Sequence, residues 1–323
     1  MGKMNSKSCG ILDERYTLEC KIGDGASSNV YKVKDSFSDN YYAAKIFEEH
    51  SEIFDREILF NKKILKSKDN NHFFIKYISS SLNATLDNDK EQKCYILFEL
   101  ATKGSLSQYV FNYGAPFDEK NCKVISYKII LALQSLHEIG ICHRDIKAEN
   151  ILLKGERFDI KIADFGLSGF IYGNNGKILQ NEKVGTDHYM APEVLYEKEY
   201  DGEKSDIFST GVLLFTLLTR KIPFPIAIIF NKGTKIQKLY KLIKEKDEKN
   251  YWETLKEKQI EGLSPEFKDL FFKMVAYKPN ERPSLNEILN HSWMKEVTNL
   301  NKEEYIKYEE DLISELKKRK ENL

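Results

Sequence analysis

The sequence is poor in the features that mark secreted, membrane-spanning and nucleic-acid-binding proteins. Its 323 residues include only five cysteines, an odd number without a Cys-x-x-Cys pair, which argues against a disulfide framework or a cysteine zinc site. Lys and Arg number 50, as do Asp and Glu, so the formal net charge is zero and the overall charge does not favour nucleic acid as a partner. We therefore expect a protein of the reducing cytoplasm that binds no nucleic acid.

Long hydrophobic runs are also missing. The longest apolar stretch, residues 207–218, is interrupted by Ser209, Thr210 and Thr216 and falls short of the ~18 residues that a membrane-spanning helix needs, so we predict a buried helix there. The first 18 residues are mostly polar and lack the apolar core of a signal peptide. With 41% hydrophobic residues, 31% charged residues and 7 prolines, the composition is that of a globular protein. At roughly 150 residues per domain, the length allows about two folding units or one large bilobal domain.

The periodicity of the sequence changes near residue 101. Before that point, strand-like runs cover residues 16–18, 30–33, 41–47 and 94–100, and one amphipathic helical pattern covers residues 52–65. After it, helical patterns cover residues 121–139, 205–218, 265–275 and 286–294. Polar residues 69–71 and 87–93 indicate surface loops. The predicted fold class is α+β, with a small sheet and one helix followed by a larger, mainly helical part.

A glycine-rich segment lies between two of the strand-like runs. Gly23 and Gly25 form a Gly-x-Gly pattern, and glycines let a backbone approach phosphate oxygens and present N–H donors to them. A plain hairpin turn explains the same pattern, and Ser28 stands where a third glycine is usual. The position between strands argues against a dinucleotide-binding oxidoreductase, in which the glycines lie at a strand-to-helix turn.

Ionisable residues further along the chain indicate phosphate chemistry. Lys45 ends a strand-like run, and the helical segment after it offers Glu57, which could keep the lysine charged and aimed at phosphate oxygens. The segment from His143 to Asn150 then packs several polar groups together, and Asp164-Phe-Gly follows. Here an aspartate can accept a proton, a lysine can neutralise a phosphate, and amide and carboxylate oxygens can hold magnesium.

With these motifs in order, the sequence resembles the eukaryotic protein kinase family. The glycine-rich segment, Lys45, Glu57, His143-Arg-Asp and Asp164-Phe-Gly are followed by Ala191-Pro-Glu, the run from Asp206 to Gly211, and Arg282-Pro. Within this family, the motifs of the sequence are most similar to those of the calcium/calmodulin-dependent kinase-like group. The resemblance implies a kinase domain over residues 16–295, with an N-lobe at 16–101 and a C-lobe at 102–295. Residues 1–15 would be an N-terminal extension and residues 296–323 a helical C-terminal one.

The resemblance also implies roles for individual residues, with ATP and Mg²⁺ as cofactors. The catalytic set would be Asp145, Lys147, Lys45, Glu57 and Thr186. The nucleotide would contact Ile22, Gly23, Gly25, Val30, Ala43, Lys45, Phe98, Glu99, Ala101 and Leu152. Asn150 and Asp164 would hold the metal. Glu193 would pair with Arg282 in the helical lobe, Asp206 would anchor the catalytic loop, and Thr186 would bond near Asp145 and Lys147.

Serine and threonine hydroxyls are the expected acceptors, because Lys147 lies two residues after Asp145 and the run from Gly185 to Glu193 resembles the serine/threonine-specific form. The alternative is a pseudokinase that acts as a binding module, for which Ser28 in the glycine-rich loop is the argument. That alternative needs a missing catalytic group, and no catalytic group is missing from the sequence. We therefore expect an active enzyme.

The activation segment departs from many relatives at Glu182, which stands where the resemblance implies a phosphorylatable threonine. No Ser, Thr or Tyr lies between Tyr172 and Thr186. We expect Glu182 to pair with Arg144 and to order the segment without phosphorylation, although a carboxylate brings less charge than a phosphate. The alternative is a solvated Glu182 in a loop that is held by packing.

Substrate preference is less clear from the sequence. Glu149 is one of the carboxylates that basic-directed relatives place around the cleft, but Ser105 and Thr216 stand where further acids often lie. A strong preference for arginine before the phosphosite is therefore not expected. Asp187 would favour a basic residue just after the phosphosite.

Both ends of the chain carry patterns of their own. Residues 1–6 fit an N-myristoylation pattern at Gly2, and Cys9 could take a second acyl chain, which would associate the protein with a membrane, although Lys3 counts against it. Residues 299–323 have apolar residues at helical spacing before a short basic end. A helix that is solvated or packed on the lobe is favoured over a calmodulin-type regulatory target.

Overall fold

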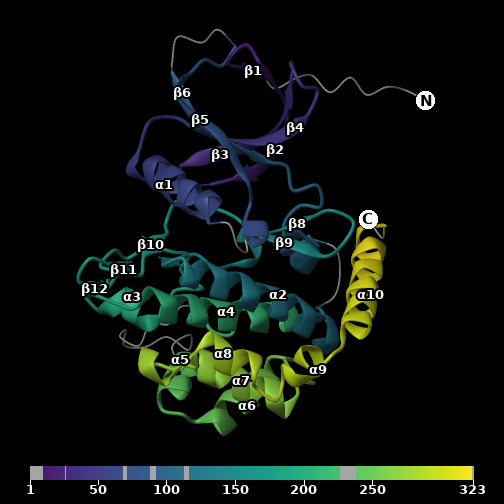
Figure 1. The fold of residues 1–323 in the computed structure, drawn as a ribbon. Coiled ribbons are helices and arrows are strands. Elements are labelled where there is room, and N and C mark those ends of the chain that lie inside the picture. The colour runs from purple at the N-terminus through teal and green to yellow at the C-terminus, as the bar shows by residue number, and fades with distance from the viewer. Residues whose placement is uncertain are drawn as a thin grey trace.

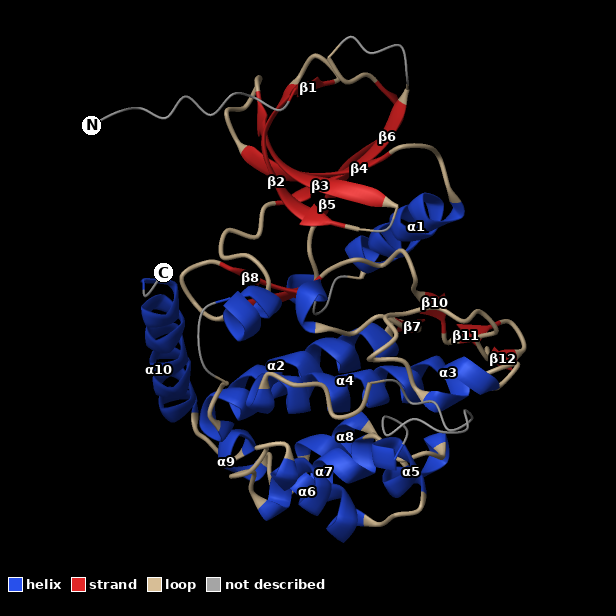
Figure 2. Ribbon diagram, turned by 180° about the vertical axis from the view of Figure 1, so that it is seen from behind, coloured by secondary structure: helices blue, strands red, loops and turns tan. Residues whose placement is uncertain are grey.

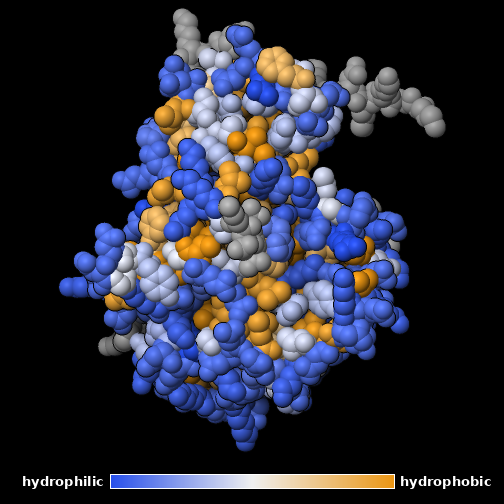
Figure 3. All heavy atoms as spheres, viewed as in Figure 1, coloured by the Kyte–Doolittle hydropathy of each residue, from blue (hydrophilic) through white to orange (hydrophobic). Residues whose placement is uncertain are grey.

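The computed structural model describes residues 10–25, 27–67, 71–87, 92–112, 116–225 and 238–321. They form a curled β-sheet lobe above a larger helical lobe (Figure 1). Most of the surface seen from this side is hydrophilic, and hydrophobic side chains show mainly in the middle of the molecule (Figure 3). The two-lobed α+β fold expected from the sequence is confirmed.

The upper lobe is built on one antiparallel sheet with the strand order β1-β2-β3-β4-β6-β5. Its strands are β1 (Gly10–Leu12), β2 (Tyr16–Asp24), β3 (Ser28–Asp35), β4 (Tyr41–Phe47), β5 (Tyr77–Ala84) and β6 (Lys93–Glu99). A bridge between Leu12 and Leu86 brings the β1 edge to the chain just after β5, so the sheet curls into a nearly closed ring (Figure 2).

Two of these strands are not predicted from the sequence. The sheet begins before residue 16, because β1 lies within the stretch expected to be an extension and pairs Gly10 with Leu18. β5 contains Ser79, Ser80 and Ser81, which hide the alternation of apolar and polar residues that marks a strand. Partner strands, not the local pattern, hold both segments extended.

Helix α1 (Glu52–Lys66) matches the predicted helix at residues 52–65 within one residue. The side chain of Ser51 caps it by accepting a hydrogen bond from the backbone N–H of Phe54 at 3.3 Å. Its buried residues are Phe54, Glu57, Phe60, Asn61 and Ile64, which share one face at helical spacing. The carboxylate of Glu57 is therefore buried on the same face as the apolar side chains.

The lower lobe is mainly helical. Its helices are α2 (Glu119–Glu138), α3 (Pro192–Tyr196), α4 (Gly202–Thr219), α5 (Lys238–Lys244), α6 (Glu248–Glu257), α7 (Pro265–Met274), α8 (Leu285–Leu289), α9 (Lys295–Thr298) and α10 (Lys302–Glu321). Helix α4 is buried along almost its whole length, as predicted for residues 207–218. Within the described ranges, no helix is both long and apolar enough to cross a membrane.

Three pairs of short strands complete the lower lobe. They are β7 (Ile141–Cys142) with β10 (Gly169–Phe170), β8 (Ile151–Lys154) with β9 (Asp159–Ile162), and β11 (Tyr172–Gly173) with β12 (Gly176–Lys177). The first two pairs flank the segments that the sequence marks as chemically active. They position those segments against the sheet lobe.

The prediction of a helix over residues 286–294 is wrong, because α8 ends at Leu289. Beyond it, the backbone N–H of Trp293 donates to Nδ1 of His291 at 3.2 Å, and the Trp293 indole donates to Glu119 at 2.8 Å. Trp293 is 1% exposed. Burying this large side chain outweighs the local helical pattern, since tertiary packing overrides weak propensity.

The C-terminal helix α10 packs on the lower lobe, in line with one of the expected outcomes. Leu312 and Leu316 belong to the main apolar core. The ammonium of Lys120, on α2, donates to Asp311 at 2.8 Å, and the guanidinium of Arg319 lies over the ring of Phe117, 4.2 Å from its centroid. The apolar face of the helix is thus covered by this chain itself.

Candidate active site

Charged side chains from both lobes meet at Lys45. Its Nζ, on β4, donates to Oε2 of Glu57 on α1 at 2.6 Å and to Oδ1 of Asp164 at 3.0 Å. Lys45 is 8% exposed and Glu57 is 1% exposed, so this ion pair lies largely out of water. The structure brings Lys45 and Glu57 together as the sequence predicts.

Burial and charge act in opposite directions on the pKa values of these groups. Burial alone would lower the pKa of Lys45, but the carboxylates of Glu57 and Asp164 outweigh it and raise that pKa. Burial raises the pKa of Glu57 to about 7, against the lowering effect of Lys45. Burial would raise the pKa of Asp164, but the Lys45 ammonium outweighs it and the pKa is lowered. Lys45 and Asp164 are therefore both charged at neutral pH.

A second polar cluster forms around the carboxylate of Asp145. The hydroxyl of Thr186 donates to Oδ1 at 2.7 Å, and the ammonium of Lys147 lies 2.7 Å from Oδ2. Lys147 also donates to the Thr186 hydroxyl at 2.7 Å. The amide of Asn150 donates through Nδ2 to Oδ2 of Asp145 at 3.0 Å. The predicted contact of Thr186 with Asp145 and Lys147 is confirmed.

Backbone pairing joins the two clusters. The N–H of Ala163 donates to the carbonyl oxygen of Asn150 at 2.9 Å, and Ile151 stands opposite Ile162 in the β8–β9 pair. Asn150 precedes this hairpin and Asp164 follows it, so the two residues stand at its adjoining ends. Asn150 and Asp164 are 14 positions apart in the sequence, but the hairpin brings them to about the distance between two neighbouring strands.

A buried aspartate holds the catalytic loop in shape. Asp206, 0% exposed, accepts hydrogen bonds from the backbone N–H groups of His143 at 2.8 Å and Arg144 at 2.7 Å. Arg144 has φ of +67°, a backbone conformation that costs free energy for a residue other than glycine. The carboxylate offsets that cost, as expected of an anchor. The sequence does not reveal that His137 also contacts Asp206, at 2.9 Å.

Gly166 lets α1 come close to the segment after Asp164. A Cβ at Gly166 would lie 2.7 Å from Cγ2 of Ile53 and 3.7 Å from Oε2 of Glu57. A Cβ at this position would require the side chain of Ile53 on α1 to move. This glycine therefore allows the close packing of Ile53 on the segment after Asp164.

The residues expected to surround adenine come mainly from one apolar cluster. Ala43 stands opposite Phe98 in the sheet, and both pack in a cluster with Ala101 and Leu152. The pairing of β4 with β6 ends at Glu99, so the backbone from residue 100 to 101 leaves the sheet between the lobes.

The glycine-rich segment forms the β2–β3 hairpin above these residues. Gly23 stands opposite Val30 in the β2–β3 pair, and Val30 stands opposite Lys45 in the β3–β4 pair. The N–H of Gly25 donates to the carbonyl oxygen of Ser28 at 2.8 Å, and Ser28 is 6% exposed. Ile22 is 44% exposed. The hydrogen bond between Gly25 and Ser28 joins the two strands through backbone atoms alone, so it does not depend on the serine side chain.

The oxygen atoms of Asn150 and Asp164 fit a divalent cation. Asn150 uses its Nδ2 on Asp145, which leaves the amide oxygen for another partner. Asp164 is ionised, and Lys45 contacts only its Oδ1. Its side chain is 43% exposed, and carboxylate and amide oxygens are hard ligands of the kind that Mg²⁺ prefers.

Glu182 pairs with Arg144 as predicted and with a second arginine that the sequence analysis missed. Its carboxylate accepts from Arg144 at 2.8 Å and from both terminal nitrogens of Arg56 at 2.8 and 2.7 Å. Hydrogen bonds from Arg56 and Arg144 lower the pKa of Glu182. Arg56 precedes Glu57 on α1, and that adjacency is the signal that could have identified it. The solvated alternative for Glu182 is wrong.

The expected ion pair in the helical lobe is also present. Arg282 donates from its two terminal nitrogens to the two carboxylate oxygens of Glu193 at 2.6 and 2.7 Å. Both residues are buried. This pair ties the segment before α4 to the segment after α7.

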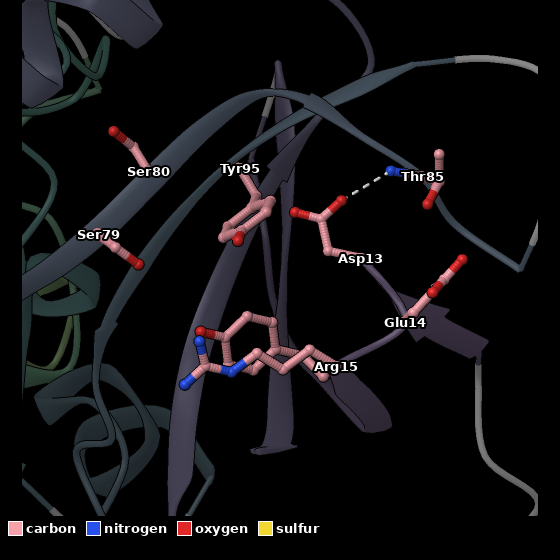
Figure 4. A pocket seen from close by; sticks show the side chains of 8 residues that line it. Asp13, Glu14, Arg15, Ser79, Ser80, Thr85 and Tyr95 are labelled. Carbon is pink, nitrogen blue, oxygen red and sulfur yellow. Dashed lines mark hydrogen bonds between the residues drawn. The ribbon is translucent and has the colours of Figure 1, made fainter. Parts of the chain in front are cut away.

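A hollow of about 450 Å³ lies away from these groups. Asp13, Arg15, Ser79 and Tyr95 line it, at the outer end of the sheet lobe (Figure 4). Asp13 accepts from the backbone N–H of Thr85 at 3.1 Å, and Arg15 is paired with Asp35 at 2.8 Å. None of its lining residues belongs to the clusters around Lys45 and Asp145, so we assign no catalytic role to it.

Comparison with known proteins agrees with this geometry. The model of the protein kinase domain matches residues 16–294. A probable serine/threonine-protein kinase MARK-B of Dictyostelium discoideum is 31% identical, over 86% of this chain and 36% of its own length. Myosin light chain kinase A of the same organism is 29% identical, over 95% of this chain and 97% of its own length. CBL-interacting protein kinase 22 of Oryza sativa subsp. japonica is 28% identical, over 88% of this chain and 63% of its own length.

The family model covers more than half of the chain, and it begins and ends close to the boundaries of the two lobes. The relatives named above are similar along most of this chain, although the chain spans only about a third of the first of them. The chain therefore belongs to the protein kinase family, among relatives of the serine/threonine type.

Proposed function

We propose that the protein transfers the γ-phosphate of Mg²⁺-bound ATP to serine and threonine hydroxyls of proteins. The observation that carries the proposal is that two polar contacts lie at the ends of one β-hairpin. Lys45 contacts Asp164 at one end, and Asn150 contacts Asp145 at the other. Side chains from three separate segments of the sequence thus come together. Phosphate transfer to a generic protein with ATP, with and without magnesium, tests the proposal against a scaffold role.

Each side chain would contribute through position or charge. Asp145 would orient the substrate hydroxyl and accept its proton, while Lys147 and Thr186 hold the carboxylate in place. Lys45, kept charged by Glu57, would bind the α- and β-phosphates. Asn150 and Asp164 would hold the cation, which when bound neutralises charge on the phosphates. Gly23 and Gly25 would let the backbone cover them.

The walls of the nucleotide site would be apolar. Ala43, Val30 and Leu152 would enclose the adenine ring, with Ile22 at the edge, and Phe98 would close the back of the site. The backbone from Glu99 to Ala101 would bind the adenine edge. Support comes from the shared apolar cluster of Ala43, Phe98, Ala101 and Leu152.

We further infer that activity needs no phosphorylation of the activation segment. Glu182 bridges Arg144 of the catalytic loop and Arg56 of α1, the helix that also carries Glu57. A permanent carboxylate would thereby couple the segment to the Lys45–Glu57 pair. The carboxylate is half-exposed, so each contact is screened by water and the clamp is weaker than a buried one.

Glu182→Gln is expected to lower kcat by about tenfold, because the loss of charge-assisted hydrogen bonds to two arginines amounts to roughly 1.5 kcal/mol. Phosphatase treatment of the unaltered protein is expected to leave its rate unchanged. Both are measured as initial rates on one protein substrate.

Glu199→Gln is the matched control, since Glu199 is an exposed carboxylate close by. A double-mutant cycle with Arg56→Met should show coupling, because the two residues contact each other. A large loss of activity on phosphatase treatment would contradict the inference, as would additive effects of the two substitutions.

Substrate preference is a further part of the proposal. Asp187 and Glu149 are exposed and would face a bound peptide, whereas Thr216 is fully buried and donates to the carbonyl oxygen of Val212 at 2.9 Å. We expect a basic residue just after the phosphosite to raise kcat/KM about threefold, because it would form an exposed ion pair with Asp187 and such pairs contribute little free energy. A peptide array that varies this position checks the effect, and indifference there would remove it.

Location and regulation complete the proposal. A cytoplasmic protein is expected, and acylation at Gly2 and Cys9 would associate it with a membrane; both residues lie outside the described ones. Mass spectrometry of native protein tests for the acyl chains. We propose that α10 is an integral part of the lobe, because Leu312 and Leu316 are buried in its core. A regulatory partner of the calmodulin type would have to displace it, which a binding assay with calcium and calmodulin can detect.

A further inference from the structure

Arg319 is buried near the end of α10, although the basic residues around it lie in solvent. Arg319 is 9% exposed, whereas Lys317, Lys318 and Lys320 are classed as exposed. A charged side chain is rarely buried unless other protein groups pair with it. Figure 1 shows α10 running up the lower lobe to the level of β8, so this end of the helix lies at the height where the two lobes meet.

The partners of Arg319 lie mainly in the segment that connects the expected hinge with α2. Its Nη2 donates to the carbonyl oxygen of Pro116 at 3.0 Å, and its guanidinium lies over the ring of Phe117. Its Nη1 donates to the carbonyl oxygen of Tyr109 in a longer contact of 3.4 Å. Its Nε donates to Oε1 of Glu315, one turn earlier on α10, at 2.8 Å. Arg319 thus fastens α10 to the connecting segment at two places.

Tyr109 extends this connection to strand β8. It is 2% exposed, and its hydroxyl donates to the carbonyl oxygen of Lys103 at 3.0 Å. The N–H of Lys103 donates in turn to the carbonyl oxygen of Leu153 at 3.1 Å. Leu152, the neighbour of Leu153 on β8, is one of the residues expected to lie against adenine. Three consecutive contacts therefore join Arg319 to a wall of the proposed nucleotide site.

We propose that Arg319 is a positioning residue for the nucleotide site, which holds the segment at residues 103–109 against β8 and thereby keeps Leu152 in place beside adenine. The contact with Tyr109 favours this role over one of stability alone, because the Tyr109 hydroxyl bonds to the backbone that follows the hinge. A role in stability alone predicts unaltered nucleotide affinity once the guanidinium is removed. The inference rests on the proposed function, since it places ATP between the lobes.

The first test measures the binding of adenosine, and of ADP with magnesium, to the full chain carrying Arg319→Met. Methionine keeps much of the apolar stem but removes the guanidinium. Both Kd values are expected to rise about three- to tenfold, the contribution of one hydrogen bond. The factor should be the same for both ligands, because adenosine has no phosphates and the contacts lead to the adenine wall. Lys318→Met, at an exposed neighbour on α10, is the matched control and should change neither value.

Initial rates and a second variant provide further readouts. In Arg319→Met, KM for ATP should rise by the same factor while kcat stays within about twofold, whereas a loss of folded protein would lower kcat at an unchanged KM. Tyr109→Phe removes the hydroxyl that bonds to Lys103 but keeps the ring, so it should weaken adenosine binding as well. Because both residues act through one series of contacts, the two effects should be less than additive.

Thermal unfolding shows whether each variant is folded. A folded Arg319→Met protein that binds adenosine within about twofold of the unaltered affinity would overturn the inference. If Arg319→Met does not fold, Tyr109→Phe decides, since unchanged adenosine binding by that variant would overturn the inference and weaker binding would support it. A lack of phosphate transfer by the unaltered chain would contradict the proposed function instead, because the binding of adenosine does not require that reaction.

Discussion

Asp145→Asn is expected to lower kcat by about 10²- to 10⁴-fold, the usual contribution of a positioned general base. Asparagine keeps the shape of the side chain but cannot accept a proton from a hydroxyl. The amide oxygen can still accept from Thr186, which now donates to Oδ1 at 2.7 Å, but the amide NH2 group would face the donors Lys147 and Asn150, so thermal unfolding of the variant is measured beside its rate. Steady-state rates on a protein substrate measure the loss.

Binding of ATP separates a chemical effect from a folding effect. The affinity for ATP, followed by thermal stabilisation, should change by less than about tenfold, because Asp145 is not among the residues expected to contact the nucleotide. Asp159→Asn is the matched control, since Asp159 is exposed on β9, and it should keep the full rate. If Asp145→Asn keeps more than a tenth of the unaltered turnover, the assignment of the base is wrong.

Lys45→Met should lower kcat/KM for ATP by about 10²- to 10³-fold, the range for removing one electrostatic stabiliser of a developing charge. The substitution keeps much of the apolar stem but removes the ammonium that lies between Glu57 and Asp164. Burial already raises the pKa of Glu57 to about 7, so this carboxyl group can become protonated once its partner is gone. We therefore expect a folded, inactive protein.

Glu57→Gln tests the Lys45–Glu57 ion pair by removing the charge of the carboxylate partner. It keeps Lys45 in contact with Asp164, so its loss in kcat/KM should be smaller than that of Lys45→Met. Thermal unfolding of both variants shows whether the fold survives. A Lys45→Met protein that is folded and within about threefold of the unaltered kcat/KM would show that this lysine does not act on the phosphates.

Arg56 links these expectations to the activation segment. It lies on α1 beside Glu57, and its guanidinium holds Glu182. Any change that loosens Glu182 would thus reach Lys45 through one rigid helix. This connection explains how a single carboxylate could influence both the loop that carries Asp145 and the site of the phosphates.

The sequence predicts well those segments whose role depends on local pattern. Helix α1 has an apolar face, a capping serine and acidic residues in its first turn, and the prediction is accurate within one residue. The helix predicted at residues 286–294 fails because Trp293 gains more from burial than from continuing the helix. Strand β5 is missed because its serines are held extended by β6, and a pairing partner is not visible in local periodicity.

Motif order and residue type are properties of the linear chain, and they were enough to predict the family, the two-lobed architecture and the identity of the reactive side chains. The folded structure was needed to show that Glu182 meets two arginines instead of one and that His137 contacts the buried Asp206. These features depend on contacts between residues up to 126 positions apart. Such contacts arise from the packing of whole elements, which no local pattern encodes.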